Sequence, residues 1–268
     1  MISVIIPVYN AEKTLEKALL SVKKQTWDGV FEVIVVNDGS TDQSAEVIAR
    51  FRAQHPKMNI RVIHQENGGA SKARNAGLQM ASHDFIALLD ADDEWLPEKT
   101  EKQLNLLLDA HLNIDFLSCL RVGDRIRFPY RVGKHHLAAM TFRKLMLRNG
   151  APTPTVIFRK EILRHTGFFD PNQRYAEDLN YWLRISLNHK MYILDDSLVI
   201  TGAGKRSFGV SGLSANLREM ERGFQKNLRG MRDLEAISNV AFLSYRLFYK
   251  LKYLVRLARH NFYNLLGK

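Results

Sequence analysis

The stretch Asp84-Phe85-Ile86-Ala87-Leu88-Leu89-Asp90-Ala91-Asp92-Asp93 decides how this chain is organised. Its first half is an apolar run, which is typical of a strand buried on both faces of a sheet. Its second half places three carboxylates within four residues, where the strand ends. Ligands of open α/β sheets bind at the carboxyl ends of the strands, so we expect these acids at a binding edge.

The acidic cluster predicts a divalent metal site. Three crowded carboxylates repel one another unless a cation lies among them. Mg²⁺ and Mn²⁺ take oxygen ligands and commonly connect carboxylates to substrate phosphates. The alternative is a solvated turn that caps the next helix, with Pro97 in its first turn.

The charges of the chain are divided unevenly. Residues 1–120 hold 12 Lys and Arg against 17 Asp and Glu, a net of −5, whereas residues 121–268 hold 27 against 11, a net of +16. This asymmetry indicates that the second half faces an anionic partner, which could be a membrane, a nucleic acid or a polyphosphate.

Composition restricts the class of protein. With 46% hydrophobic residues the chain can bury a substantial core, and it has no apolar run of roughly 18 residues that could span a membrane. A strand begins at Ile2 without a basic leader, which argues against secretion. The single cysteine, Cys119, cannot form an internal disulfide, so we expect a buried thiol in a cytoplasmic protein.

Apolar runs alternate with helical patterns along the first half of the chain. Strands are expected at residues 2–7, 33–36, 60–63, 85–89 and 114–117. Helices are expected after Asn10 as N-cap, around Val47, Ile48 and Phe51, over residues 70–81, and from Pro97 onward. This alternation predicts an α/β fold with a doubly wound, mostly parallel sheet.

Polar residues follow three of these strands, at Pro7–Asn10, Asn37–Gly39 and Asp90–Asp93. A nucleotide fits across such a crevice, because an aromatic ring can stack on its base and a carboxylate can accept from a base N–H. Tyr9 and Asp38 suit these two roles, although ordinary turn chemistry also explains Asp-Gly-Ser.

The helix that begins near Gly68-Gly69-Ala70 offers backbone donors to a diphosphate. Lys72 and Arg74 are candidate cations there, and solvated surface charges are the alternative. Two other phosphate motifs are excluded: no G-x-G-x-x-G follows the first strand, and Gly202–Arg206 lacks the spacing and the Ser/Thr of a P-loop.

The motifs Val4–Asn10, Asn37–Asp42, Gly69–Gly77 and Leu89–Asp93 stand in the order seen in family 2 glycosyltransferases of the GT-A fold. Gly167–Asp170 and Ala176–Leu179 are similar to that family's acceptor-side motifs, so the resemblance spans roughly residues 2–200. It implies an enzyme that transfers a sugar, with inversion, from a nucleotide-diphosphate donor that is most often a UDP-sugar. The alternative is a protein that binds or transfers nucleotides at the same sheet edge without glycosyl transfer.

The resemblance also implies roles for individual residues. Asp92 would be the principal ligand of Mn²⁺ or Mg²⁺, with Asp93 nearby, and Asp178 of the Glu177-Asp178 pair would be the general base. The expected nucleotide-sugar-binding residues are Pro7, Tyr9, Asn10, Asp38, Lys72, Arg74, Asp90, Ala91, Asp92, Lys205 and Arg206.

Two features qualify these roles. Many family members carry a histidine after the last core strand, whereas this chain has Gly204-Lys205-Arg206-Ser207, so Lys205 or Arg206 would neutralise the leaving diphosphate instead. Glu177 and Asp178 also stand at the start of a predicted helix, where acids are favoured by the helix dipole, and both interpretations can hold together.

Residues 121–136 form a basic loop without a clear period, which we assign to the side of an anionic acceptor such as a lipid pyrophosphate. His135 and His136 have no third ligand nearby and are interpreted as surface residues. We divide the chain into a nucleotide-sugar-binding half (1–120), an acceptor-binding half of the same domain (121–212) and a basic amphipathic helical extension (213–268). A nucleic-acid binder is the weakest alternative, because the first half is acidic and contains no known nucleic-acid module.

The C-terminal segment predicts a helix that lies on an anionic membrane. No acid follows Glu235, and six Lys and Arg occur between Ala241 and Lys268. On a helical wheel one face carries Leu243, Leu247, Leu251, Leu254, Ala258, Phe262 and Leu265, and the other carries Arg246, Lys250, Lys252, Arg256 and Arg259. This pattern is typical of a helix in the membrane interface, and predicts a peripheral protein on the cytoplasmic face. The alternative is that the apolar stripe docks on the catalytic domain or on another subunit.

Overall fold

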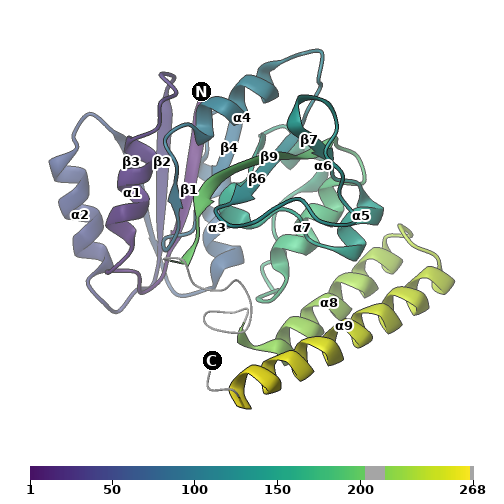
Figure 1. Cartoon of the computed structure of the whole chain (residues 1–268). Helices are drawn as coiled ribbons and strands as arrows, with labels where there is room; N and C mark the ends of the chain where they lie inside the picture. Colours follow the sequence, from purple (N-terminus) through teal and green to yellow (C-terminus); the bar gives the residue numbers. More distant parts are fainter. Residues whose placement is uncertain (203–214, 266–268) are drawn as a thin grey trace.

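The computed structural model describes residues 1–202 and 215–265, and its side chains are described as far as residue 262 (Figure 1). Within these ranges one sheet contains nine strands. Its order along the main path is β3 (Asn59–Gln65), β2 (Phe31–Asp38), β1 (Ile2–Val8), β4 (Phe85–Leu88), β8 (Ile157–Arg159), β6 (Phe116–Arg121), β9 (Met191–Ile200) and β5 (Glu94–Trp95). The short β7 (Leu137–Ala139) pairs with β9 off this path.

The strand pairing confirms the mostly parallel α/β sheet. Strands β1 to β4 are parallel, and Val4 of β1 lies between Val33 of β2 and Ala87 of β4. Strand β8 then runs antiparallel to both β4 and β6, while β6 and β9 are parallel. The carboxyl ends of β1, β2 and β4 therefore meet at one edge of the sheet, which confirms the edge predicted from the polar residues that follow these strands.

Helices cover both faces of the sheet. Successive residues of a strand point to opposite faces, and apolar residues on both faces are buried against these helices. Val4 and Ile6 of β1 pack with α1 (Leu15–Lys23), α2 (Ser44–Gln54) and α4 (Lys99–Leu108). Ile5 of β1 packs in the opposite core with α3 (Ala70–Met80), α5 (Phe142–Leu147), α6 (Ile162–Thr166) and α7 (Glu177–Ile185). Cys119 is buried in the first of these cores, as expected for a structural thiol.

The predicted N-cap at Asn10 is wrong. Helix α1 begins at Leu15, and Asn10 adopts a left-handed backbone conformation with φ 50°. Asparagine tolerates this conformation better than most residues. Its side-chain oxygen instead accepts from the backbone N–H of Thr41 at 2.9 Å, so Asn10 ties the end of β1 to the turn after β2.

The C-terminal extension is an antiparallel pair, α8 (Leu217–Asp233) and α9 (Asn239–Leu265), with α9 on the outside of the molecule (Figure 1). Asn216 caps α8 by accepting from Glu219 N. Tyr249 of α9 stacks on Phe224 of α8 with ring centroids 5.2 Å apart, and its hydroxyl donates to Met146 O in α5. Among the described helices, none combines the length and apolarity needed to cross a membrane.

Candidate active site

A cleft of about 1890 Å³ opens at the sheet edge where β1, β2 and β4 end. One wall contains the strand ends and the start of α3, and the opposite wall contains residues 171–175 with the beginning of α8. Tyr253, Leu257 and His260 of α9 complete the lining. The cleft brings together nine residues that the sequence predicted for nucleotide-sugar binding: Pro7, Tyr9, Asn10, Asp38, Lys72, Arg74, Asp90, Ala91 and Asp92.

Asp38, at the end of β2, organises the part of the cleft assigned to the base. Its carboxylate accepts from Gly68 N and Gly69 N, both at 2.8 Å, and from Gln65 Nε2 at 2.6 Å. Gly69 has φ 85°, a conformation that strongly favours glycine. An ionised carboxylate offers about four lone-pair positions, so Asp38 retains capacity for one further donor. Tyr9 is 53% exposed beside it, which leaves a ring face available for stacking.

Arg74 connects the loop after β4 to the start of α7. Its guanidinium donates to Asp90 at 2.8 Å and to Glu177 at 3.0 Å, and the side chain is buried. Burial alone would lower the pKa of Arg74, but the charges of Asp90 and Glu177 outweigh it and raise that pKa. The sequence suggested a diphosphate as the partner of Arg74, whereas the structure pairs it with Asp90 of the cleft and with Glu177, which begins α7 outside the lining of the cleft.

The three acids after β4 point in different directions. Asp90 faces Arg74, and Asp92 is exposed in the cleft. Asp93 is buried and accepts from Gly202 N at 2.9 Å, just beyond β9. Burial raises the pKa of Asp93 to about 8, with smaller contributions from the charges of Asp90 and Asp92.

This donor set fits a hard divalent cation only in part. Within the described ranges, no three His, Cys, Asp or Glu side chains are grouped closely enough to hold a metal by themselves. Asp92 still offers carboxylate oxygens to the cleft, where phosphate oxygens of a bound nucleotide would complete the shell that Mg²⁺ or Mn²⁺ prefers. Asp93 instead connects this loop to the end of β9.

Asp178 and Glu177 begin α7, as the helix-start interpretation predicted. Asp178 accepts from Asn149 Nδ2 at 2.8 Å and from the backbone N–H of Leu179 at 2.6 Å. Burial raises the pKa of Asp178 to about 7, and the charge of Glu177 adds to this effect. A carboxylate with a pKa near neutrality is well suited to take up a proton during a reaction.

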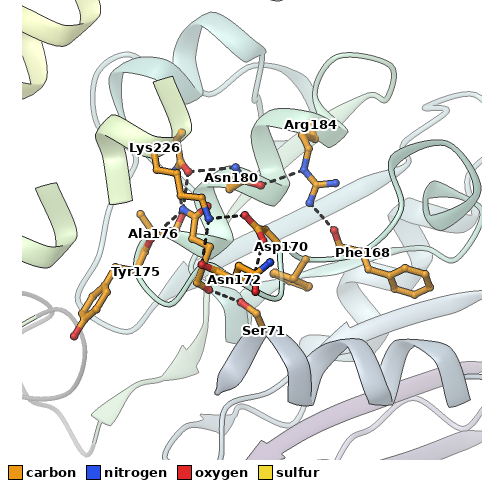
Figure 2. A network of polar contacts seen from close by, with 12 residues as sticks. Ser71, Phe168, Asp170, Asn172, Tyr175, Ala176, Asn180, Arg184 and Lys226 are labelled. Carbon is orange, nitrogen blue, oxygen red and sulfur yellow. Dashed lines mark hydrogen bonds and ion pairs between the residues drawn. The ribbon is translucent and has the colours of Figure 1, made fainter. Parts of the chain in front are cut away.

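The loop before these acids lies in a network of polar contacts with α3 and α8 (Figure 2). Gln173 Nε2 donates to Asn227 Oδ1 at 2.6 Å, and Asn227 Nδ2 donates to Ala176 O at 3.0 Å. On the other side, Ser71 Oγ of α3 donates to Gln173 O at 2.8 Å. Ala176 has φ 54°, an unfavourable conformation for a residue with a Cβ, so these bonds fix the residue that precedes Glu177.

Helix α8 comes unusually close to this loop. A Cβ placed on Gly223 would lie 2.3 Å from Tyr175 O, so only glycine allows the approach. One turn further along α8, Lys226 Nζ binds Asp170 at 2.7 Å, and α3 holds the same motif through Asn75, which donates to Phe169 O. The Gly167–Asp170 and Ala176–Leu179 motifs are thus anchored from both sides.

Sequence reasoning missed Gln173, Asn227 and Asn149. The polar positions of α8 that face inward give no pattern that distinguishes them from solvated ones, because their partners lie more than 50 residues away. His135 and His136 are exposed, as predicted. The expected diphosphate contacts Lys205 and Arg206 lie outside the described residues.

The sequence model of glycosyl transferase family 2 matches residues 3–168, which is more than half of the chain. The chain belongs to this family. It is 33% identical over 213 residues to the amylovoran biosynthesis glycosyltransferase AmsE of Erwinia amylovora, a match that covers 76% of this chain and 77% of AmsE.

Solved structures share its fold. The structure of Staphylococcus aureus TarS 1–349 with UDP-GlcNAc matches with TM-score 0.72 and 24% identity, over 100% of this chain and 76% of that one. The mannosyltransferase PcManGT of Pyrobaculum calidifontis with GDP-Man and Mn²⁺ matches with TM-score 0.67 and 18% identity, over 94% and 69%. The chain spans between 26% and 34% of the length of several curated relatives, including full-length TarS.

Proposed function

We propose that this protein is an inverting glycosyltransferase that moves a sugar from a nucleotide-diphosphate donor to a hydroxyl of a glycan or lipid-linked glycan during polysaccharide biosynthesis. The observation that carries this proposal is the bridge from Asp90 through Arg74 to Glu177, next to Asp178. It joins a nucleotide-binding sheet edge to a carboxylate with the pKa of a base. AmsE, named as a glycosyltransferase of amylovoran biosynthesis, and TarS, named as a poly(ribitol-phosphate) β-N-acetylglucosaminyltransferase, support the same activity.

The donor would lie across the ends of β1, β2 and β4. Tyr9 would stack on the base, Asp38 would accept from a base N–H, and Pro7 and Asn10 would shape the floor. Lys72, at the start of α3, would face the diphosphate together with backbone N–H groups of that helix. UDP-GlcNAc in the TarS structure favours a UDP-sugar as donor.

We assign the metal contact to Asp92. A bound Mn²⁺ or Mg²⁺ would neutralise the charge of the departing diphosphate. Asp92 is the exposed carboxylate of the cluster, and Mn²⁺ occurs with the nucleotide-sugar in PcManGT. Asp93 would support this site from behind by fixing the loop against Gly202.

Asp178 would act as the general base. As the acceptor hydroxyl attacks the anomeric carbon, its proton would pass to the Asp178 carboxylate while the bond to the diphosphate breaks. No general acid is needed, because the bound metal ion, and not a proton, would balance the negative charge of the leaving diphosphate. Asn149 and the N–H of Leu179 would hold the carboxylate, and Glu177 would remain paired with Arg74.

The acceptor would approach past residues 171–175 and α9, from the cytoplasmic face of an anionic membrane to which the protein binds peripherally. The basic second half of the chain supports an anionic acceptor of this kind.

A hydrolysis assay with a panel of nucleotide-sugars and Mn²⁺ tests the proposal. We expect slow release of the nucleoside diphosphate from one donor, abolished by Asp92→Ala. If the protein binds nucleotides tightly but cleaves no nucleotide-sugar in the presence or absence of glycan acceptors, the alternative of nucleotide binding or nucleotidyl transfer without glycosyl transfer replaces it.

A further inference from the structure

Helix α9 has two apolar faces of different character. The face toward the rest of the molecule is aromatic: Phe242 and Tyr249 are buried there against α8. The opposite face carries large aliphatic side chains that are 55% to 75% exposed. We call this exposed set the leucine stripe; it consists of Val240, Leu243, Leu247, Leu251, Leu254 and Val255.

The exposure of the stripe excludes one of the alternatives that the sequence left open. Docking of the leucine face on the catalytic domain is wrong, because the face that docks is the aromatic one. Two cations expected on the polar face turn inward with it: Lys252 Nζ donates to Leu147 O at 2.8 Å, and Arg256 lies 5.1 Å from the Phe224 ring centroid. The leucine stripe is left facing outward along four turns of the helix.

Positive charge flanks the stripe on both sides. At about 100° per residue, Arg246 and Lys250 fall on one flank and Arg259 on the other, and all three are exposed. The sequence from Ala236 to Lys268 contains no acid. Two copies that paired through the stripe would bring these like charges together. A lipid bilayer with an apolar interior and anionic headgroups complements both the stripe and its flanking cations.

We propose that the leucine stripe lies in the interface of an anionic lipid bilayer, with the α8–α9 pair as a platform that carries the catalytic domain. The aliphatic side chains would enter the boundary between headgroups and acyl chains. Arg246, Lys250 and Arg259 would meet the phosphates of the headgroups.

This placement also orients the cleft. Tyr253, Leu257 and His260 line the cleft from the same helix that carries the stripe, so the cleft mouth would stand within about one helix diameter, ~10 Å, of the headgroups. An acceptor anchored in the bilayer through a phosphate-containing lipid headgroup could then reach the cleft without leaving the membrane. This identification of the acceptor class rests on the proposed function, whereas the docking surface itself does not.

Vesicle co-sedimentation of the full chain tests the docking surface. Wild type, the stripe variant Leu247→Glu/Leu251→Glu and the matched control Val30→Glu/Leu108→Glu would be compared on phosphatidylcholine vesicles with and without 30% phosphatidylglycerol. The control adds the same charge at two exposed apolar residues outside the α8–α9 pair. We expect wild type and control to bind anionic vesicles in a salt-sensitive manner, and the stripe variant to bind at least about tenfold more weakly.

Equal binding of the stripe variant and wild type would overturn the proposal, as would indifference to lipid charge. Light scattering without lipid tests whether a second copy of the chain covers the stripe instead. If the wild type is a dimer, the stripe variant is a monomer and both bind vesicles equally, the stripe is an interface between copies. Nucleotide-sugar hydrolysis in lipid-free buffer separates the two proposals. A wild-type protein that hydrolyses a nucleotide-sugar but does not bind vesicles would refute only the membrane-docking proposal. A wild-type protein that binds vesicles but hydrolyses no nucleotide-sugar would refute only the proposed glycosyltransferase activity.

Discussion

On the proposed donor side of the cleft, Asp38 is held by residues of the neighbouring strand and the loop after it, whereas the proposed acceptor side is held by a helix that lies about 50 residues further along the chain. Asp38, at the end of β2, accepts from Gln65 Nε2 at the end of the neighbouring parallel strand β3 and from the N–H groups of Gly68 and Gly69 in the loop after β3. The loop that leads to Asp178 is fixed by Gln173 and by Asn227, which comes from a helix near the end of the chain.

Because of this difference, donor binding and turnover should respond to substitutions in different parts of the molecule. A donor site made by strand ends is preserved as long as the sheet forms. The proposed acceptor side is held by α8 and depends on how the C-terminal pair docks, so changes in that pair should alter the position of Asp178, the proposed base, while donor binding stays intact. Substitutions on the two sides should therefore separate donor binding from turnover.

The largest effect is expected for Asp92→Ala on the donor side. Removing the exposed carboxylate should abolish Mn²⁺-dependent donor binding and turnover, because it is the acid of the cluster that the cleft presents to a phosphate-bound cation. The measurement is donor titration by calorimetry with and without Mn²⁺. An unchanged circular dichroism melt would show that the fold is intact, and full Mn²⁺-dependent turnover in the variant would remove Asp92 from the metal site.

Asp178→Asn on the acceptor side should lower kcat by roughly 10²–10⁴-fold, the range typical for loss of a general base. Donor affinity should change little, since Asp178 contacts Asn149 and Leu179 and not the strand ends. Steady-state kinetics with a varied donor concentration separates the two parameters. A variant whose main defect is donor affinity would shift the role to Glu177.

The pH profile should identify the same residue. With a pKa of about 7, Asp178 must lose its proton before it can accept one, so kcat should fall about tenfold per pH unit below 7. The Asp178→Asn variant should lack this limb in its residual activity. A wild-type profile that is flat between pH 5 and 8 would contradict the assignment.

The raised pKa of Asp178 also predicts how the free energy of unfolding depends on pH. Burial raises it from an ordinary value of 3.8 to about 7, so between those pH values the folded state holds a proton that the unfolded state has lost. The free energy of unfolding should therefore fall as the pH rises from about 4 to about 7. Urea unfolding of wild type and Asp178→Asn at pH 4.5 and 8 should show the variant gaining relative stability at the higher pH. A constant difference between the two proteins would show that the carboxyl ionises without penalty.

Asn227→Ala tests the role of α8 in positioning. It removes a buried amide that bonds Gln173 and Ala176, so we expect a loss of about 1–3 kcal/mol in the free energy of unfolding. We also expect kcat to fall about tenfold with donor affinity unchanged, because Ala176 would no longer be held in its left-handed conformation. Arg229→Ala, an exposed position on the same helix, is the control. Equal losses of donor affinity and kcat in Asn227→Ala would indicate a general structural defect instead.

The sequence predicted the donor side better than the acceptor side, for a physical reason. Apolar runs mark the strands, and polar residues at their ends must meet at one edge of a parallel sheet, so Tyr9, Asp38 and Asp90 could be placed together. Gln173 and Asn227 meet only because α8 packs on the loop through Gly223, a contact between segments about 50 residues apart that no periodic pattern encodes. The directions of single side chains were also beyond prediction: Asp92 and Asp93 are adjacent, yet one faces the cleft and the other Gly202.

The smallest effect is expected for Lys226→Met, next to Asn227. Its ammonium group binds Asp170 at 2.7 Å, but the lysine side chain is 41% exposed and the carboxylate 30%. Exposed ion pairs contribute about 1 kcal/mol or less, because water solvates both charges almost as well when they are apart. The variant should therefore unfold within about 1 kcal/mol of wild type and retain kcat within about twofold, measured in the same urea and kinetic assays. A loss as large as that of Asn227→Ala would mean that the ion pair holds the loop on α8 as strongly as the buried amide does.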